Sequence, residues 1–272
     1  MVLAILDGWG VGPAGAGNAI TSADTPNIDR LWVSYPHTQL EASGEAVGLP
    51  RGEVGNTETG HLNIGAGKIV YQDLARINMS IADGSFFSSP TLEAVANHVK
   101  TNASDLHLIG LIGAGGVHSN LEHLFALIQF ASRQSIKNLY LHLITDGRDS
   151  PPTSSKTYIS QIRNILQREK IGNFASIMGR FWAMDRDRRW ERTLKAYRAL
   201  TLGEGHLNKT PEEAIEESYK VGKTDEFIEP SLMMNTEGKP LSLIKENDAV
   251  IFYNFRVDRP RQLSRAFVFS EE

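Results

Sequence analysis

The sequence predicts an α/β protein with a mostly parallel sheet. Short apolar runs that end in glycine-rich polar loops alternate with longer stretches whose apolar residues recur at helical spacing. This alternation is typical of parallel strands joined by helical crossovers. Residues 18–68 differ, because they are rich in Gly, Ser, Thr, Asn and Pro and contain few periodic runs. We therefore expect two regions, with a boundary near residues 73–76.

Five apolar runs have the length and composition of buried strands. They are residues 2–6, 106–112, 139–144, 174–178 and 249–253. Helices are expected to begin near Ser119, Ser154, Arg188 and Thr210. Two of these starts carry capping-box patterns, Ser119 with Glu122 and Thr210 with Glu213. Such a pair predicts the first turn of a helix.

The composition excludes several classes of protein. With 41% hydrophobic and 22% charged residues the chain is globular, and its net charge of -4 argues against nucleic acid or an anionic membrane as a partner. The chain has no cysteine, which rules out disulfides and thiolate metal sites and fits the cytoplasm. No apolar run approaches the roughly 18 residues that a membrane span needs. The first run is also too short for a secretion signal.

Asp7 follows the first predicted strand and precedes Gly8-Trp9-Gly10. Ligands of open α/β sheets bind beyond the carboxyl ends of the strands, and a carboxylate there suits a divalent cation. Asp7 could equally cap the next helix or turn. The local sequence leaves both interpretations open.

Thr57 lies in the glycine-bounded block Gly55 to Gly67. A hydroxyl presented at a helix N-terminus, where free N–H groups favour a bound phosphate, can act as a nucleophile once a base or metal activates it. The alternative is that Thr57 is simply an N-cap. Gly60 stands where a capping-box partner would be, which weakens that alternative.

Four later polar loops each follow a predicted strand. If these strands are parallel neighbours, the loops open at one edge of one sheet and their cationic side chains converge. Guanidinium groups match phosphate and carboxylate in two-point contacts, so the convergence predicts a site for a small phosphorylated acid. The converging residues are His118, Arg148, Arg180, Arg186, Arg256 and Arg259.

Six segments in chain order resemble the cofactor-independent phosphoglycerate mutases. They are residues 6–10, 55–67, 113–120, 145–152, 179–188 and 254–259. The most specific are the block from Gly55 to Gly67 and the block Gly-Arg-x-x-Ala-Met-Asp-Arg from Gly179 to Arg186. The resemblance covers residues 7–259, nearly the whole chain.

The resemblance implies a member of the alkaline phosphatase superfamily with two domains. Residues 1–74 would be the N-terminal part of a phosphatase domain, and residues 75–272 a transferase domain that is incomplete at its C-terminus. The implied enzyme is a cytoplasmic monomer of glycolysis and gluconeogenesis. It interconverts 3-phosphoglycerate and 2-phosphoglycerate through a phosphoenzyme, with two manganese or similar ions and without 2,3-bisphosphoglycerate.

The resemblance also implies roles for individual residues. Asp7 matches a metal ligand, and Thr57 matches both the nucleophile and a metal ligand. The positions that bind substrate in the family match His118, Arg148, Asp149, Arg180, Arg186, Arg256 and Arg259.

The chain departs from the family in two respects. The family nucleophile is serine, whereas Thr57 stands here, with a β-branch that restricts χ1. The chain ends at Glu272, and a missing C-terminal half would carry most Asp and His metal ligands and a catalytic lysine. We therefore expect this chain alone to be inactive. Three functions stay open: a mutase that needs its C-terminal half, another phosphomutase or phosphatase of the superfamily, and a non-catalytic phosphoglycerate-binding module.

Overall fold

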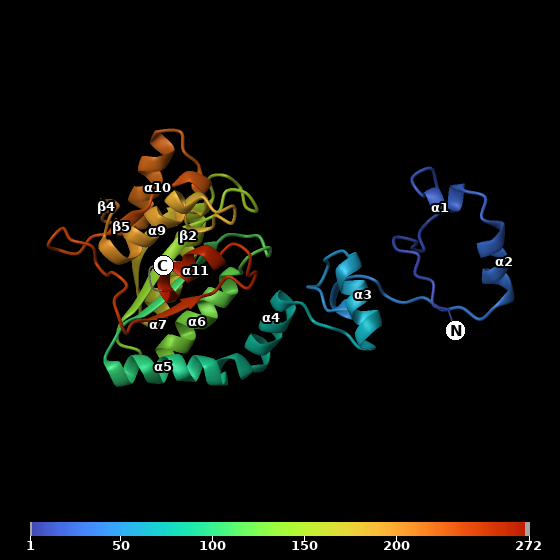
Figure 1. Cartoon of the computed structure of the whole chain (residues 1–272), viewed down its shortest axis with the longest axis horizontal. Helices are drawn as coiled ribbons and strands as arrows, with labels where there is room; N and C mark the ends of the chain where they lie inside the picture. The colour runs from blue at the N-terminus through green and yellow to red at the C-terminus, as the bar shows by residue number, and fades with distance from the viewer. Residues whose placement is uncertain (1, 270–272) are drawn as a thin grey trace. The chain divides into compact units, whose positions relative to one another are not determined.

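Two compact units, Met1–Ala75 and Arg76–Glu272, make up the chain (Figure 1). The computed structural model describes residues 2–269. Within that range, no helix combines the length and the apolar character needed to cross a bilayer.

The first unit holds short helices and little buried surface. Its elements are α1 (Ala19–Ser22), α2 (Pro26–Ser34), the 3-10 turn η1 (Gly44–Val47), α3 (Thr57–Ala66) and the start of α4 (Asp73–Asp83). The predicted strand at residues 2–6 is wrong: this segment is irregular, and the Val2 side chain is 93% exposed. A strand needs a hydrogen-bonded neighbour and a covered face, and the described residues of this unit supply neither.

The second unit is built on a six-stranded sheet in the order β4-β5-β3-β2-β1-β6. The pairs β1–β2, β2–β3, β1–β6 and β4–β5 are parallel, whereas β3–β5 is antiparallel. The mostly parallel α/β sheet predicted from the sequence is therefore confirmed. The strands are β1 (Leu106–Ile112), β2 (Leu139–Thr145), β3 (Asn173–Gly179), β4 (His206–Asn208), β5 (Ser231–Met233) and β6 (Ala249–Phe252).

Helices cover both faces of this sheet (Figure 1). One face packs on a core that includes residues of α5 (Pro90–Asn102), α6 (Leu121–Arg133), α7 (Ser155–Glu169) and α10 (Pro211–Lys220). The other face packs on α8 (Arg180–Ala183), α9 (Trp190–Leu202) and α11 (Arg261–Val268). The 3-10 turns η2 (Ser85–Ser88) and η3 (Asp225–Phe227) complete the unit. Because both faces are covered, the central strands are mainly apolar, with His107, His142 and Ser176 as buried polar exceptions.

One of the two predicted capping residues caps its helix, and the other does not. Thr210 does cap α10, because its side chain accepts a hydrogen bond from the Glu213 N–H at 3.2 Å. The box at Ser119 is wrong: Asn120 caps α6 and accepts from the Glu122 N–H. The Ser119 hydroxyl instead donates to the Leu111 carbonyl at 2.7 Å, which ties the loop after β1 back to the strand.

Candidate anion-binding site

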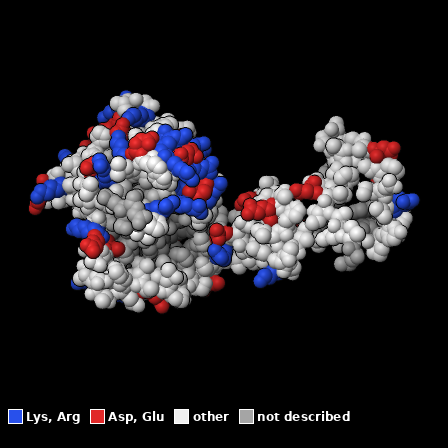
Figure 2. Space-filling view, viewed as in Figure 1, with Lys and Arg blue, Asp and Glu red and all other residues white. Residues whose placement is uncertain are grey.

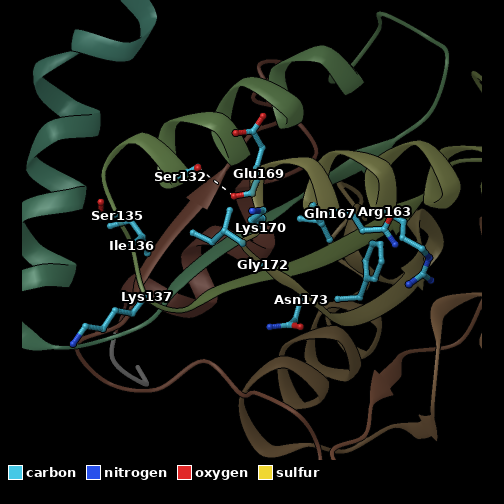
Figure 3. A pocket seen from close by; sticks show the side chains of 13 residues that line it. Ser132, Ser135, Ile136, Lys137, Arg163, Gln167, Glu169, Lys170, Gly172 and Asn173 are labelled. Atoms are coloured by element: carbon cyan, nitrogen blue, oxygen red, sulfur yellow. Dashed lines mark hydrogen bonds between the residues drawn. The ribbon is translucent and has the colours of Figure 1, made fainter.

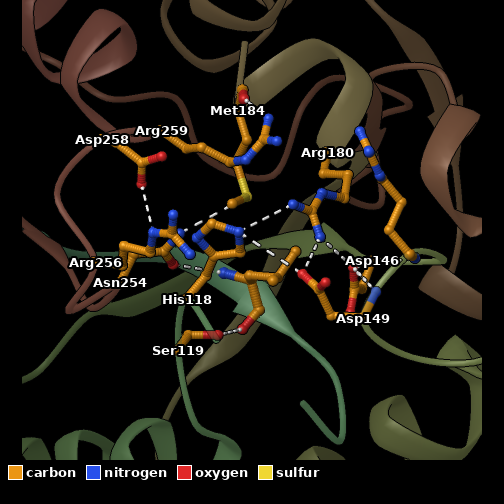
Figure 4. Close-up of polar contacts among 12 residues, drawn as sticks. His118, Ser119, Asp146, Asp149, Arg180, Met184, Asn254, Arg256, Asp258 and Arg259 are labelled. Carbon is orange, nitrogen blue, oxygen red and sulfur yellow. Dashed lines mark hydrogen bonds and ion pairs between the residues drawn. The ribbon is translucent and has the colours of Figure 1, made fainter. Parts of the chain in front are cut away.

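The loops that follow β1, β2, β3 and β6 open at the same edge of the sheet, because these four strands are parallel. They bring together side chains that are far apart in the sequence (Figure 4). Figure 2 shows Lys and Arg side chains interleaved with Asp and Glu on the second unit.

Arg180 is the centre of this cluster. It begins α8 directly after β3, and only 3% of its side chain is exposed. Its Nη1 donates to the Asp146 and Asp149 carboxylates at 2.6 Å each, and its Nη2 donates to His118 Nε2 at 3.1 Å. Burial by itself lowers the pKa of Arg180, but the hydrogen bonds to Asp149 and Asp146 outweigh burial and raise it. The guanidinium is therefore fixed in position and charge.

His118 is buried and neutral at pH 7. Burial, together with the Arg180 charge, lowers the pKa of His118 to about 4. Because Arg180 donates to Nε2, the ring proton is assigned to Nδ1. The Nδ1 atom is buried and has no hydrogen-bond partner among residues 2–269. His118 thus offers a donor that the chain itself leaves unsatisfied.

Arg259 is a second partly satisfied cation. Its Nη1 donates to the Met184 carbonyl at 3.0 Å, whereas its buried Nε has no partner in the described chain. Burial lowers the pKa of Arg259, and the nearby Arg180 and Arg186 charges lower it further. Repulsion among these cations favours an anion between them.

Arg186 and Arg256 are held together by Asp258. The Arg186 Nη1 donates to the Asp258 carboxylate at 2.7 Å. The Arg256 Nε lies 3.1 Å from the other oxygen of Asp258, and Figure 4 shows these two residues side by side. Both arginine side chains are about half exposed. Arg148 is more exposed and lies 3.7 Å from Glu226.

A cavity of about 210 Å³ lies among these side chains. Four of the predicted binding residues line it, namely Arg148, Arg180, Arg186 and Arg259. The other three, His118, Asp149 and Arg256, contact members of this cluster but do not line the cavity. A site with this charge and size suits a small phosphorylated acid.

Sequence reasoning missed three side chains of this site. Asp146 is 1% exposed and anchors Arg180, yet it was passed over within the loop after β2. Arg189 and Arg192 also line the cavity. Arg192 stacks on Phe181 at 3.6 Å and lies near Asp185. The position of Asp146, an acid immediately beyond a buried strand, was the available signal.

In the first unit, Thr57 and Asp7 are in contact. The Thr57 Oγ1 donates to Asp7 Oδ2 at 2.8 Å, and both side chains are exposed. Asn56, rather than Thr57, is the N-cap of α3, and it accepts a hydrogen bond from the Thr59 N–H. The N-cap alternative for Thr57 is therefore wrong, and its hydroxyl faces a carboxylate instead.

A group of Asp and His side chains lies at the amino-terminal ends of β1 and β6, away from the loops that form the arginine cluster. Ligand atoms of Asp105, His107 and Asp248 lie within 4.8 Å of one another. Hydrogen bonds already occupy this group: His107 Nε2 lies 3.2 Å from Asp248, and its Nδ1 lies 2.9 Å from His142. His142 in turn contacts the Ser176 hydroxyl at 2.8 Å. This buried chain joins β1, β2 and β3 and accounts for the group without an ion.

A larger cavity, of about 690 Å³, lies near the starts of β2 and β3 (Figure 3). Its lining includes Lys137, Arg163 and Lys170. Arg163 is already paired with Glu212 at 2.6 Å. No buried donor without a partner lies in this lining, in contrast to the cluster around Arg180.

The family model described as the BPG-independent PGAM N-terminus matches residues 77–272. The chain belongs to this family. It is 54% identical over 268 residues to the 2,3-bisphosphoglycerate-independent phosphoglycerate mutase of Moorella thermoacetica, covering 98% of this chain and 52% of the relative. Mutase 1 of Methanosarcina barkeri is 52% identical over 270 residues, with the same coverage.

A solved structure is also similar. The chain matches that of Leishmania mexicana phosphoglycerate mutase, determined at low cobalt concentration, with a TM-score of 0.77 and 32% identity. The match covers 98% of this chain and 51% of the other. The chain thus spans about half the length of the relatives it matches.

Proposed function

We propose that this chain is the substrate-binding and nucleophile-bearing part of a phosphoglycerate mutase. The reaction is the interconversion of 3-phosphoglycerate and 2-phosphoglycerate through a phosphoenzyme. Family membership supports the reaction class. The observation that carries the proposal for this chain is the set of buried donors without a partner around one arginine-lined cavity: His118 Nδ1, Arg180 Nε and Arg259 Nε. Unsatisfied buried donors are rare, and in this proposal a bound oxyanion provides a partner for donors of the cluster.

Each residue of the cluster has a distinct task in this proposal. Asp146 and Asp149 hold Arg180 so that its fork stays in place without substrate. Arg259 and Arg180 bind the anionic groups of phosphoglycerate, and His118 donates from Nδ1. Arg148, Arg186 and Arg256 are more exposed, and they would close on the ligand from the solvent side. Together they retain glycerate while the phosphoryl group is away.

Thr57 is the proposed phosphoryl acceptor. Its hydroxyl donates a hydrogen bond to the Asp7 carboxylate at 2.8 Å. Asp7 and Thr57 offer two side-chain ligands, which suits one edge of a manganese site but is too few for two ions. When bound, such ions would lower the pKa of the hydroxyl and stabilise the developing charge. The remaining ligands would come from the C-terminal half of the relatives.

The surface of the first unit supports a need for that half. Many of its apolar side chains are exposed, among them Val2, Leu40 and Val54, each at least 80%. Exposed apolar surface of this extent marks an interaction site. We propose that it is covered in the complete enzyme, where residues 1–74 join a phosphatase domain and residues 75–272 form the transferase domain.

A coupled assay with 3-phosphoglycerate tests the proposal. This chain is assayed alone, and again with the separately produced C-terminal half of the Moorella thermoacetica mutase and manganese. We expect product only from the mixture. The competing function, a non-catalytic binding module, predicts calorimetric binding of phosphoglycerate by this chain and no product from either sample. That module is favoured by one observation, namely that the whole cavity lies within the second unit.

A further inference from the structure

The turn η3 is anchored below the arginine-lined cavity by its first residue, Asp225. The Asp225 side chain is fully buried, and its carboxylate accepts the backbone N–H groups of Ser154 and Ser155 at 2.9 and 3.0 Å. The Asp225 carbonyl accepts the Thr145 hydroxyl at 2.7 Å. These bonds fix the backbone of the next residue, Glu226, beside the end of β2.

Two glycines leave room for the Glu226 backbone. At Gly147, where φ is +73°, a Cβ atom would lie 2.8 Å from the Glu226 backbone nitrogen. At Gly179, the last residue of β3, a Cβ atom would clash with the Glu226 carbonyl. The Gly179 N–H also donates to the Ile228 carbonyl at 2.7 Å. Glu226 is therefore presented from a rigid backbone that the ends of two core strands hold in place.

The Glu226 side chain lines the arginine-lined cavity. Two other acids line it, Asp185 and Asp187, and Arg189 donates hydrogen bonds to both. Glu226 differs from them, because in the described part of the chain its carboxylate accepts no hydrogen bond and only lies 3.7 Å from Arg148. The Glu226 side chain is 21% exposed. The cavity wall thus holds a largely enclosed carboxylate whose oxygens the protein itself leaves available.

This carboxylate limits the charge of the ligand that the cavity accepts. Arg180 and Arg259, which also line the cavity, attract anionic groups. An anionic group close to Glu226 is repelled, and repulsion near a protein surface is several times stronger than in bulk water. A hydroxyl close to Glu226 can instead donate a hydrogen bond to it. The cavity therefore suits an acid with one phosphate and a free hydroxyl better than an acid with a phosphate on each oxygen.

We infer that Glu226 is a specificity-determining residue, which makes the cavity select a phosphorylated hydroxy acid over the corresponding bisphosphorylated acid. The inference rests on the proposed function in one respect, namely that this cavity binds phosphoglycerate. It requires neither phosphoryl transfer nor a metal ion. Arginines alone would favour the more highly charged ligand, so the expected ranking is opposite to the one that the cations predict.

Competition calorimetry with 3-phosphoglycerate and 2,3-bisphosphoglycerate tests this selection. The unaltered chain should bind the bisphosphate at least about tenfold more weakly than the monophosphate. Glu226→Gln keeps the size of the side chain and removes its charge, so it separates charge from cavity size. In this variant the ratio of the two Kd values should shift toward the bisphosphate by at least about tenfold. A partial loss of folded protein would not move this ratio, because it affects both ligands equally.

Two further variants are matched controls. Glu229→Gln removes an acid three residues further along the chain, which pairs with Lys195 and Lys223 and does not line the cavity. Glu226→Asp keeps the charge at the tested position. Both variants should preserve the ranking of the two ligands. If Glu226→Gln fails to fold, Glu226→Met, which is similar in length and also uncharged, replaces it in the same measurement.

Two results would overturn the inference alone. The first is binding of the bisphosphate by the unaltered chain as tightly as 3-phosphoglycerate. The second is binding of 3-phosphoglycerate with the same Kd ratio in the unaltered chain and in the uncharged variant, which would assign the selection to cavity size. If the unaltered chain binds neither ligand, the inference and the proposed function both fail.

Discussion

Asp146 and Arg180 form an ion pair whose oxygen and nitrogen lie 2.6 Å apart, with both side chains at most 3% exposed. The pair joins the loop after β2 to the start of α8. Asp146 Oδ1 also accepts the N–H groups of Arg148 and Asp149. One carboxylate therefore fixes both the central guanidinium and the backbone of a neighbouring binding loop.

Asp146→Asn keeps the shape of the side chain and removes its charge, so that Arg180 is left with Asp149 alone. Removing one partner of a buried pair costs about 3–5 kcal/mol when the remaining charge is left uncompensated, and the pair with Asp149 keeps the cost here at the lower end. We expect a loss of about 3 kcal/mol in the free energy of unfolding, measured with urea. Glu212→Gln, which breaks the more exposed pair with Arg163, should cost less than about 1 kcal/mol. Equal losses in the two variants would contradict the assigned role of Asp146.

Arg256→Ala combined with Arg259→Ala should weaken binding of 3-phosphoglycerate by at least about tenfold, because each charge-assisted contact contributes roughly 1.5–3 kcal/mol. Isothermal calorimetry measures the affinity. Arg168→Ala is the control, since this exposed arginine pairs with Glu169 near the end of α7. Unchanged affinity in the double variant would remove these arginines from the site.

His118 should make the stability of the chain depend on pH. The unfolded chain protonates this ring near 6.5, whereas the folded chain keeps it neutral down to about 4. Protons therefore favour the unfolded state below pH 6.5, and the contribution of His118 to the free energy of unfolding should fall from pH 6.5 to 4 and then level off. Each such histidine contributes at most about 1.4 kcal/mol per pH unit.

His118→Gln should reduce that slope, because glutamine offers an oxygen to Arg180 but does not titrate. The pKa of His123 is also lowered by burial to about 4, so a second substitution there should reduce the slope further. Urea unfolding at several pH values measures both effects. The same slope in the native chain and in His118→Gln would show that this ring is not the buried neutral group described.

This chain alone should bind manganese weakly, because the first unit offers only two side-chain ligands in contact with each other, Asp7 and Thr57. Calorimetry with Mn²⁺ measures the affinity, and Asp7→Ala should remove what binding there is. If a tight site is found, Asp248→Asn locates it: loss in that variant would place the ion in the group with Asp105 and His107. That result would contradict the hydrogen-bonded interpretation of this group.

Sequence patterns predicted the interior of the sheet well, and its margins poorly. Residues 106–112 form β1 as expected, and all seven are buried, because a mainly apolar run between polar loops has few other solutions. The three-residue strands β4 and β5 carry no periodic signal and were missed. Residues 2–6 have the same apolar character as β1 but form no strand, since strand formation depends on a partner that the described chain does not provide.

The candidate site was predictable in outline but not in detail. Parallel strand ends placed the arginines at one edge from sequence alone. Which of them are buried is a tertiary property: Arg180 is enclosed, whereas Arg148 is more than half exposed. The carboxylates of Asp146 and Asp258 pair with particular arginines. Their partners Arg180 and Arg186 are 34 and 72 residues away in the sequence. A local sequence pattern cannot predict a pairing between residues so far apart in the sequence.

Mass spectrometry of the reconstituted protein, quenched during turnover, tests the central claim most directly. This chain is mixed with the C-terminal half of the relative, manganese and 3-phosphoglycerate, and its phosphorylated residue is located. We expect phosphate on Thr57 and not on Thr59, equal or greater turnover in Thr57→Ser, and none in Thr57→Ala, with phosphoglycerate binding intact in both. Phosphate on another residue, or full activity of Thr57→Ala, would contradict the account and remove Thr57 from the mechanism.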